Sequence, residues 1–300
     1  LLWLAAPAAI TGGITQINTL IGTAIASGQE RAVPALAQAD RFYQLPLGVV
    51  GIAVAIVLLP ELSRALKGGH AAEASNLQNR SVEFVLFLTL PATAALLVIS
   101  EPIVRVLYER GAFTASDTRL VSSVLSIFAL GLPAFVLIKA FTPGYFARED
   151  TRTPMIFAAI SVAVNLTTAL ILFPSMGAPG IAIASATAGW INAGLLFAFL
   201  VRRGHWGWDM DLVRRIPLLL LASVLMGGAL YYGTGWLAPW LGPDSTLPEQ
   251  VAALALLVAA GALVYFVLAF GTGGADIRQV ARSVKRRPGQ PKAPADENAT

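Results

Sequence analysis

Long apolar segments recur along the chain and constrain its fold more than any other feature. A helix needs about 20 mainly apolar residues to cross the roughly 30 Å hydrocarbon core of a bilayer. The chain is only 13% charged, whereas soluble domains carry roughly 25% charged residues. The sequence therefore predicts an all-α, polytopic transmembrane bundle of about eight spans. The predicted spans are 1–26, 44–64, 82–106, 119–144, 154–175, 180–201, 214–238 and 248–270.

Basic residues gather in alternate loops, which supports an even number of spans. The loops after the second, fourth and sixth spans, together with the tail, hold fifteen of the 21 basic residues: Arg64, Lys67, Arg80, Arg148, Arg152, Arg202, Arg203, Arg214, Arg215, Arg278, Arg282, Lys285, Arg286, Arg287 and Lys292. Cytoplasmic loops of membrane proteins carry such an excess. We therefore expect the chain to enter from the cytoplasm and its C-terminus to return there.

Two loop motifs predict where helices begin. Thr114, with Asp117 three residues later, is typical of an N-cap followed by an acid in the first helical turn. Thr153 followed by Pro154 predicts a cap and the first residue of the fifth span. The polar, proline-rich stretch 286–300 predicts disorder. The basic segment 278–287 is expected to lie against anionic headgroups, with a protein-binding role as the alternative.

An acid, a base and an amide lie side by side in the segment ADRFYQLPLG, residues 39–48. The apolar stretch behind them, 45–59, predicts that Asp40 and Arg41 lie where a long apolar helix begins. Arg41 and Gln44 are three residues apart and share one helical face. A charge at membrane depth costs several kcal/mol unless it faces a wet cavity or a partner. The segment therefore predicts a binding site for a polar substrate, with an anion favoured.

Several other classes of site are not expected. The chain has no cysteine, so disulfides and cysteine-based metal sites are excluded. His70 and His205 lie in separate loops without an acidic ligand set, so no metal site is predicted. No catalytic or nucleotide-binding motif is present, so we expect neither an enzyme nor a cofactor. The basic residues are spread over loops that flank the membrane, which argues against nucleic acid as a partner.

Three segments carry a resemblance to a known family. Residues 39–66, 109–118 and 144–166 resemble the MurJ (MviN) lipid II flippases of bacteria, in the multidrug/oligosaccharidyl-lipid/polysaccharide exporter superfamily. The resemblance implies a fourteen-helix protein of the inner membrane, with two six-helix lobes around a cavity and two further helices. Residues 1–205 would be the second lobe, 206–275 the two additional helices that form a lipid-tail groove, and 276–300 a basic and then disordered cytoplasmic tail.

The resemblance also implies an activity. Such proteins move the undecaprenyl-pyrophosphate-linked peptidoglycan precursor across the inner membrane by alternating access, which serves cell-wall biogenesis and cell shape. Lipid II and membrane lipids would then be the partners. The first, fifth and sixth predicted spans contain no Asp or Glu, so no sodium site is predicted and the driving ion stays open.

The resemblance also implies roles for individual residues, by their positions in the family motif. Arg41 matches the cavity arginine of the family motif and suits a pyrophosphate, because its planar fork can make two parallel charge-assisted hydrogen bonds. Gln44 stands where the family often has Glu, and it could still bind a sugar or a peptide. Asp40 could orient Arg41, bond a neighbouring backbone group or act as a helix N-terminal acid. Lys139 could line the cavity or snorkel toward the cytoplasmic face.

A charge cluster follows the fourth span. The resemblance favours a gate or a contact between lobes for its members, and a solvated loop is the alternative. The members of this cluster are Arg148, Glu149, Asp150 and Arg152.

Two rival functions remain. One keeps a transporter but changes the cargo to another polyprenyl-linked oligosaccharide or a drug. The other is a membrane scaffold that does not transport and whose tail recruits cell-wall synthesis or division proteins.

Overall fold

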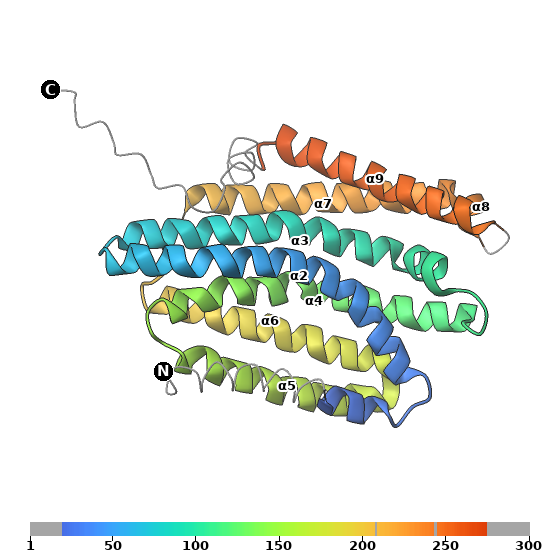
Figure 1. Cartoon of the computed structure of the whole chain (residues 1–300), viewed down its shortest axis with the longest axis horizontal. Helices are drawn as coiled ribbons and strands as arrows, with labels where there is room; N and C mark the ends of the chain where they lie inside the picture. The colour runs from blue at the N-terminus through green and yellow to red at the C-terminus, as the bar shows by residue number, and fades with distance from the viewer. Residues whose placement is uncertain (1–19, 208, 243–244, 275–300) are drawn as a thin grey trace.

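A computed structural model describes residues 20–207, 209–242 and 245–274, and these residues form helices with no strand among them (Figure 1). The all-α prediction is confirmed for this part of the chain. The helices are α2 (Ala32–Lys67), α3 (Ala71–Tyr108), α4 (Ala115–Phe146), α5 (Arg152–Met176), α6 (Ala178–Arg202), α7 (Met210–Trp236), α8 (Ala238–Leu241) and α9 (Leu247–Gly271).

Six of the described helices are long and apolar enough to cross a membrane, namely α3, α4, α5, α6, α7 and α9. The predicted span 44–64 lies inside α2. Most of the predicted span 1–26 lies outside the described residues. A multi-pass membrane protein is therefore confirmed, while the count of eight spans stays a prediction.

Two hydrophobic clusters hold the helices together. The larger one unites α2 to α6, with α4 at its centre, where Leu125 and Leu132 are fully buried. The smaller one joins α7 and α9 to α3 through residues such as Phe87 and Tyr265. Figure 1 shows the result as layers, with α7 and α9 lying along α3 on the side away from α5.

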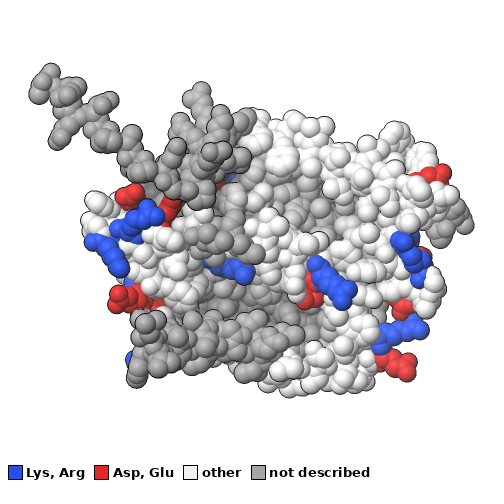
Figure 2. Space-filling model, viewed as in Figure 1, with Lys and Arg blue, Asp and Glu red and all other residues white. Residues whose placement is uncertain are grey.

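The connecting loops divide between the two ends of the bundle. The loops that follow α2, α4 and α6 meet at one end, and the loops that follow α3, α5 and α8 meet at the other (Figure 1). Figure 2 shows charged side chains concentrated toward these ends. We call the first the basic end, defined by Arg64, Lys67, Arg148, Arg152, Arg202, Arg203, Arg214 and Arg215. The basic loops that alternate along the sequence thus lie together at one end of the fold.

Exposed aromatic side chains mark the opposite end. Tyr231, Tyr232 and Trp236 near the end of α7 are 69%, 79% and 82% exposed, and Trp240 of α8 lies close by. Tyr and Trp are enriched at membrane–water interfaces because their rings are amphipathic. This end therefore has the composition of an interface belt.

The two predicted helix starts differ in outcome. At α4 the prediction is confirmed, because Asp117 N donates to Thr114 Oγ1 at 3.4 Å and Thr114 N donates to Asp117 Oδ2 at 2.9 Å. At α5 it is wrong, because the helix begins at Arg152. The carboxylate of Asp150 accepts from Thr153 N at 3.0 Å, so an acid earlier in the loop caps this helix.

Candidate functional site

The helix that carries Arg41 begins earlier than the apolar run suggests. α2 starts at Ala32, so Asp40 and Arg41 lie more than two turns inside it, and the prediction that they mark its beginning is wrong. Asp40 is therefore not a helix N-terminal acid either, because the favourable effect of the helix dipole on an acid fades beyond the first turn.

Arg41 lies on the exposed face of α2 because a neighbouring residue is anchored on the other face. Tyr43 is buried, and its ring stacks on Phe128 and meets Phe135 edge-on, with centroids 5.6 and 5.5 Å away. Two residues along a helix turn the side chain by about 200°. Burial of Tyr43 against α4 therefore turns Arg41 outward. It is exposed and makes no hydrogen bond or ion pair with another described residue.

Gln44 and Asp40 bind each other. The Gln44 amide donates to the carboxylate of Asp40, one turn earlier on the same helix. Within the described residues Asp40 is thus partnered by Gln44 and makes no hydrogen bond to Arg41. An orienting role of Asp40 toward Arg41 stays a prediction for another state of the protein.

Lys139 lies on α4 and is exposed. Its stem lies across the backbone of α2 at Gly51. The two groups near which it was predicted to snorkel are engaged elsewhere, because Tyr145 donates to Leu196 O at 2.6 Å and Arg148 donates to Gly144 O at 2.6 Å. The approach to Gly51 places the stem of Lys139 on the surface shared by α2 and α4.

The four charged residues after α4 do not form one cluster: Asp150 binds neighbouring residues, whereas Glu149 and Arg152 are exposed. Asp150 forms a 2.5 Å ion pair with Arg203 and accepts from Thr153 Oγ1 at 2.7 Å, which ties the α4–α5 loop to the end of α6. Glu149 has φ 61° and is exposed, as is Arg152. Sequence reasoning missed Arg203 as the partner, because the two residues of the pair lie 53 positions apart.

The pKa of Asp150 reflects this engagement. Partial burial raises the pKa of its carboxyl, but the hydrogen bonds from Thr153 and Arg203 outweigh burial, so the pKa lies below its ordinary value of 3.8. The stabilisation that the carboxylate supplies is therefore complete above about pH 4. It is lost as the pH falls through the lowered pKa of the folded protein.

Replacing Asp150 by Asn tests this contact. We expect the variant to lose about 1 kcal/mol of stability at pH 7, because the charge-assisted partners of the carboxylate are lost. The loss should shrink as the pH falls below about 4 and vanish below the lowered pKa of the folded protein, where the wild-type carboxylate is itself protonated. Unfolding in detergent at several pH values measures both effects, with the exposed Arg152→Gln as the control. Equal pH dependence of Asp150→Asn and wild type would contradict the assignment.

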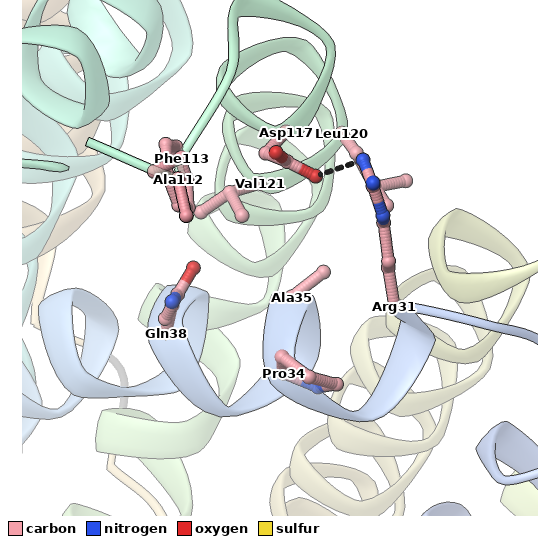
Figure 3. A pocket seen from close by; sticks show the side chains of 9 residues that line it. All are labelled: Arg31, Pro34, Ala35, Gln38, Ala112, Phe113, Asp117, Leu120 and Val121. Atoms are coloured by element: carbon pink, nitrogen blue, oxygen red, sulfur yellow. Dashed lines mark hydrogen bonds and ion pairs between the residues drawn. The ribbon is translucent and has the colours of Figure 1, made fainter. Parts of the chain in front are cut away.

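A cavity of about 330 Å³ lies between α2 and α4 at the end opposite the basic end. Figure 3 shows Arg31 reaching from the start of α2 to Asp117 of α4, where the ion pair measures 2.9 Å, and Gln38 pointing toward Phe113. Sequence reasoning missed this cavity, because its lining comes from two helices and a loop. The lining residues are Arg31, Pro34, Ala35, Gln38, Ala112, Phe113, Asp117, Leu120 and Val121.

The chain is similar to known flippases over most of its length. The family model described as lipid II flippase MurJ matches residues 1–248. A probable lipid II flippase MurJ of Rhizobium meliloti (strain 1021) is 64% identical over 286 residues, which cover 95% of this chain and 54% of that protein. One of Rhizobium tropici is 57% identical, with 98% and 55% covered.

Solved structures agree with this family. A structure titled lipid II flippase MurJ, inward closed conformation, matches with a TM-score of 0.70 and 27% identity, over 92% of this chain and 53% of that one. An outward-facing multidrug resistance MATE family transporter of the MOP superfamily, at 13% identity, shares the fold alone, with a TM-score of 0.60 over 93% of this chain and 66% of that one. The chain spans about half the length of the curated relatives it matches. By the extent of the family match and by its identity to these relatives, the chain belongs to the MurJ family of lipid II flippases.

Proposed function

We propose that this chain forms the second half of a lipid II flippase, which moves a polyprenyl-pyrophosphate glycopeptide across the inner membrane by alternating access. The observation that carries the proposal is Arg41, an exposed arginine on α2 with no partner among the described residues. A guanidinium at such a place needs water or an anion to offset its cost in the membrane. A pyrophosphate is an anion whose geometry fits its fork.

The binding face on α2 extends beyond the arginine. Gln44 is exposed, and its hydrogen bond to Asp40 keeps the acid engaged while the arginine stays open to the cargo. We assign sugar or peptide contacts to Gln44, an orienting role to Asp40 and a second cationic contact to Lys139.

The two ends of the bundle suggest its orientation. The basic end is assigned to the cytoplasm because basic loops favour that side. α9 ends at the basic end (Figure 1), so the tail that follows would be cytoplasmic. The charged loop 148–152 would then form part of a cytoplasmic gate or a contact with the first lobe.

The larger hydrophobic cluster lies mainly within residues 1–205, and the smaller one holds α7 and α9 against α3, which supports a division of the chain near residue 205. We assign 1–205 to the second transporter lobe and 206–275 to two additional helices. A cavity of about 440 Å³ lies between α3 and α7, and we assign it to the lipid-tail groove because most of its lining is apolar or aromatic, as at Val98, Pro102 and Tyr231, although Glu101 and Thr234 also line it.

A drug cation is a weaker cargo candidate. A cationic substrate needs carboxylates at membrane depth, and α5 and α6 contain no Asp or Glu. The membrane scaffold is the remaining rival, because a basic tail can also recruit cell-wall synthesis or division proteins.

Deleting residues 276–300 separates the flippase from the scaffold. In a cell that depends on the full-length protein, we expect the deletion to leave lipid II in the outer leaflet within about twofold of wild type, because the proposed cargo path lies in the helices. Depleting the whole protein should make lipid II accumulate in the inner leaflet. Loss of growth on tail deletion, with unchanged lipid II distribution on depletion, would favour the scaffold.

A further inference from the structure

Gly51 of α2 is a notch into which the stem of Lys139 fits. A Cβ built on Gly51 would overlap Cδ of Lys139, lie 2.9 Å from its Cε and lie 3.6 Å from its Nζ. Real Cβ atoms essentially never approach another carbon below 3.0 Å. Any side chain at position 51 must therefore displace the lysine.

The notch lies on the same face of α2 as the proposed cargo contacts. Gln44 and Gly51 are seven residues apart, which is about two helical turns and roughly 10 Å along the axis. Gly48 lies between them, and a Cβ there would meet nothing within 4 Å. The two glycines thus open the surface of α2 between the amide of Gln44 and the ammonium of Lys139.

The ammonium of Lys139 has no partner among the residues that the structure describes. Lys139 is exposed on α4 and makes no hydrogen bond or ion pair with another described residue. A charge on a membrane-spanning helix is costly unless it meets water or an opposite charge. The ammonium of a lysine is a point charge on a flexible stem, whereas the guanidinium of an arginine is a planar group with fixed donors. The lysine can therefore stay in contact with a phosphate that moves.

We propose that Gly51 is a positioning residue, which lets Lys139 lie across α2 and present its ammonium to the phosphates of the cargo on the face of Arg41 and Gln44. The inference rests on the proposed function, because it takes the anionic cargo from there. It adds a second phosphate contact about two turns from Gln44 and names the residue that holds the contact in place. The phosphates of the cargo would then pass from the guanidinium of Arg41 to the ammonium of Lys139, or contact both groups at once.

Gly51→Ala in the full-length protein tests the inference. Alanine favours a helix over glycine, and the group that it displaces is a flexible side chain, so we expect the variant to fold. We expect its affinity for a polyprenyl-pyrophosphate lipid and its flipping rate to fall by about tenfold, as in Lys139→Met, because a charge-assisted contact is lost. Gly194→Ala is the matched control, because Gly194 lies on α6 rather than on the proposed cargo face and a Cβ there would meet nothing within 4 Å, so this variant should bind and flip like wild type.

The double variant Gly51→Ala/Lys139→Met distinguishes positioning from packing. If Gly51 acts only through Lys139, the double variant is no worse than Lys139→Met alone. A Gly51→Ala defect that persists in full on top of Lys139→Met overturns the inference in favour of helix packing. Wild-type binding and flipping by Gly51→Ala or by Lys139→Met also overturns it.

The results that would overturn the proposed function differ from those that would overturn the role of Gly51. If Lys139→Met is harmless while Arg41→Ala strongly lowers flipping, the second contact is wrong and the flippase stands. If the unmodified full-length protein neither binds nor moves the lipid, the proposed function itself is wrong.

Discussion

Arg41→Ala in the full-length flippase is expected to lower lipid II flipping by about 10- to 100-fold, because hydrogen bonds to a charged group contribute roughly 1.5–3 kcal/mol. The guanidinium makes no hydrogen bond or ion pair with another described residue, so its removal leaves no partner unpaired there. Folding should therefore be unaffected. Arg41→Lys keeps the charge and loses the fork, so we expect an intermediate rate.

The measurement is the amount of lipid II accessible in the outer leaflet of cells that depend on the variant. Arg64→Ala is the matched control, because Arg64 is an exposed arginine on the same helix but at the basic end. Normal growth and normal lipid II exposure with Arg41→Ala would remove Arg41 from the cargo site.

Tyr265→Ala is expected to cost about 3–5 kcal/mol and to loosen α9 from α3, because it removes a large buried aromatic side chain. Tyr265 is 2% exposed, its ring meets Phe87 with centroids 5.6 Å apart, and its hydroxyl donates to Phe87 O at 2.6 Å. In a membrane such close packing takes the place of the hydrophobic effect in holding helices together. Tyr265→Phe loses only the hydrogen bond, so a cost of about 1 kcal/mol is expected.

Unfolding in detergent and proteolysis of the α8–α9 connection measure this effect. Tyr231→Ala is the control, because Tyr231 is 69% exposed on the neighbouring helix and its loss should cost little. Equal destabilisation by the two alanine variants would show that α9 is not anchored through Tyr265.

The early start of α2 shows that a continuous apolar stretch in the sequence does not predict where a helix begins. Ala32, Ala35, Ala39 and Tyr43 are buried at helical spacing, while exposed residues such as Arg41 lie between them. Such an amphipathic turn has no continuous apolar run, so hydropathy alone places the beginning of the helix too late. The 3.6-residue period was the signal that could have extended it.

The contacts of the loop residues show a second limit. The ion pair of Glu101 and Arg105 lies within one helix, where a spacing of four residues favours such a pair. The pair of Asp150 and Arg203 forms only when α5 and α6 fold back as a hairpin. No local pattern identifies such a partner.

The sequence by itself determined the helical class, the apolar spans and the gathering of basic loops at one end, because each depends on composition and spacing within one segment. It also identified Arg41, since a charge beside an apolar run is visible without coordinates. Only the tertiary structure decided that Tyr43 turns Arg41 outward and that Lys139 lies in the notch at Gly51. These outcomes depend on how α2 and α4 are rotated against each other, and that rotation is set by packing between residues about ninety positions apart.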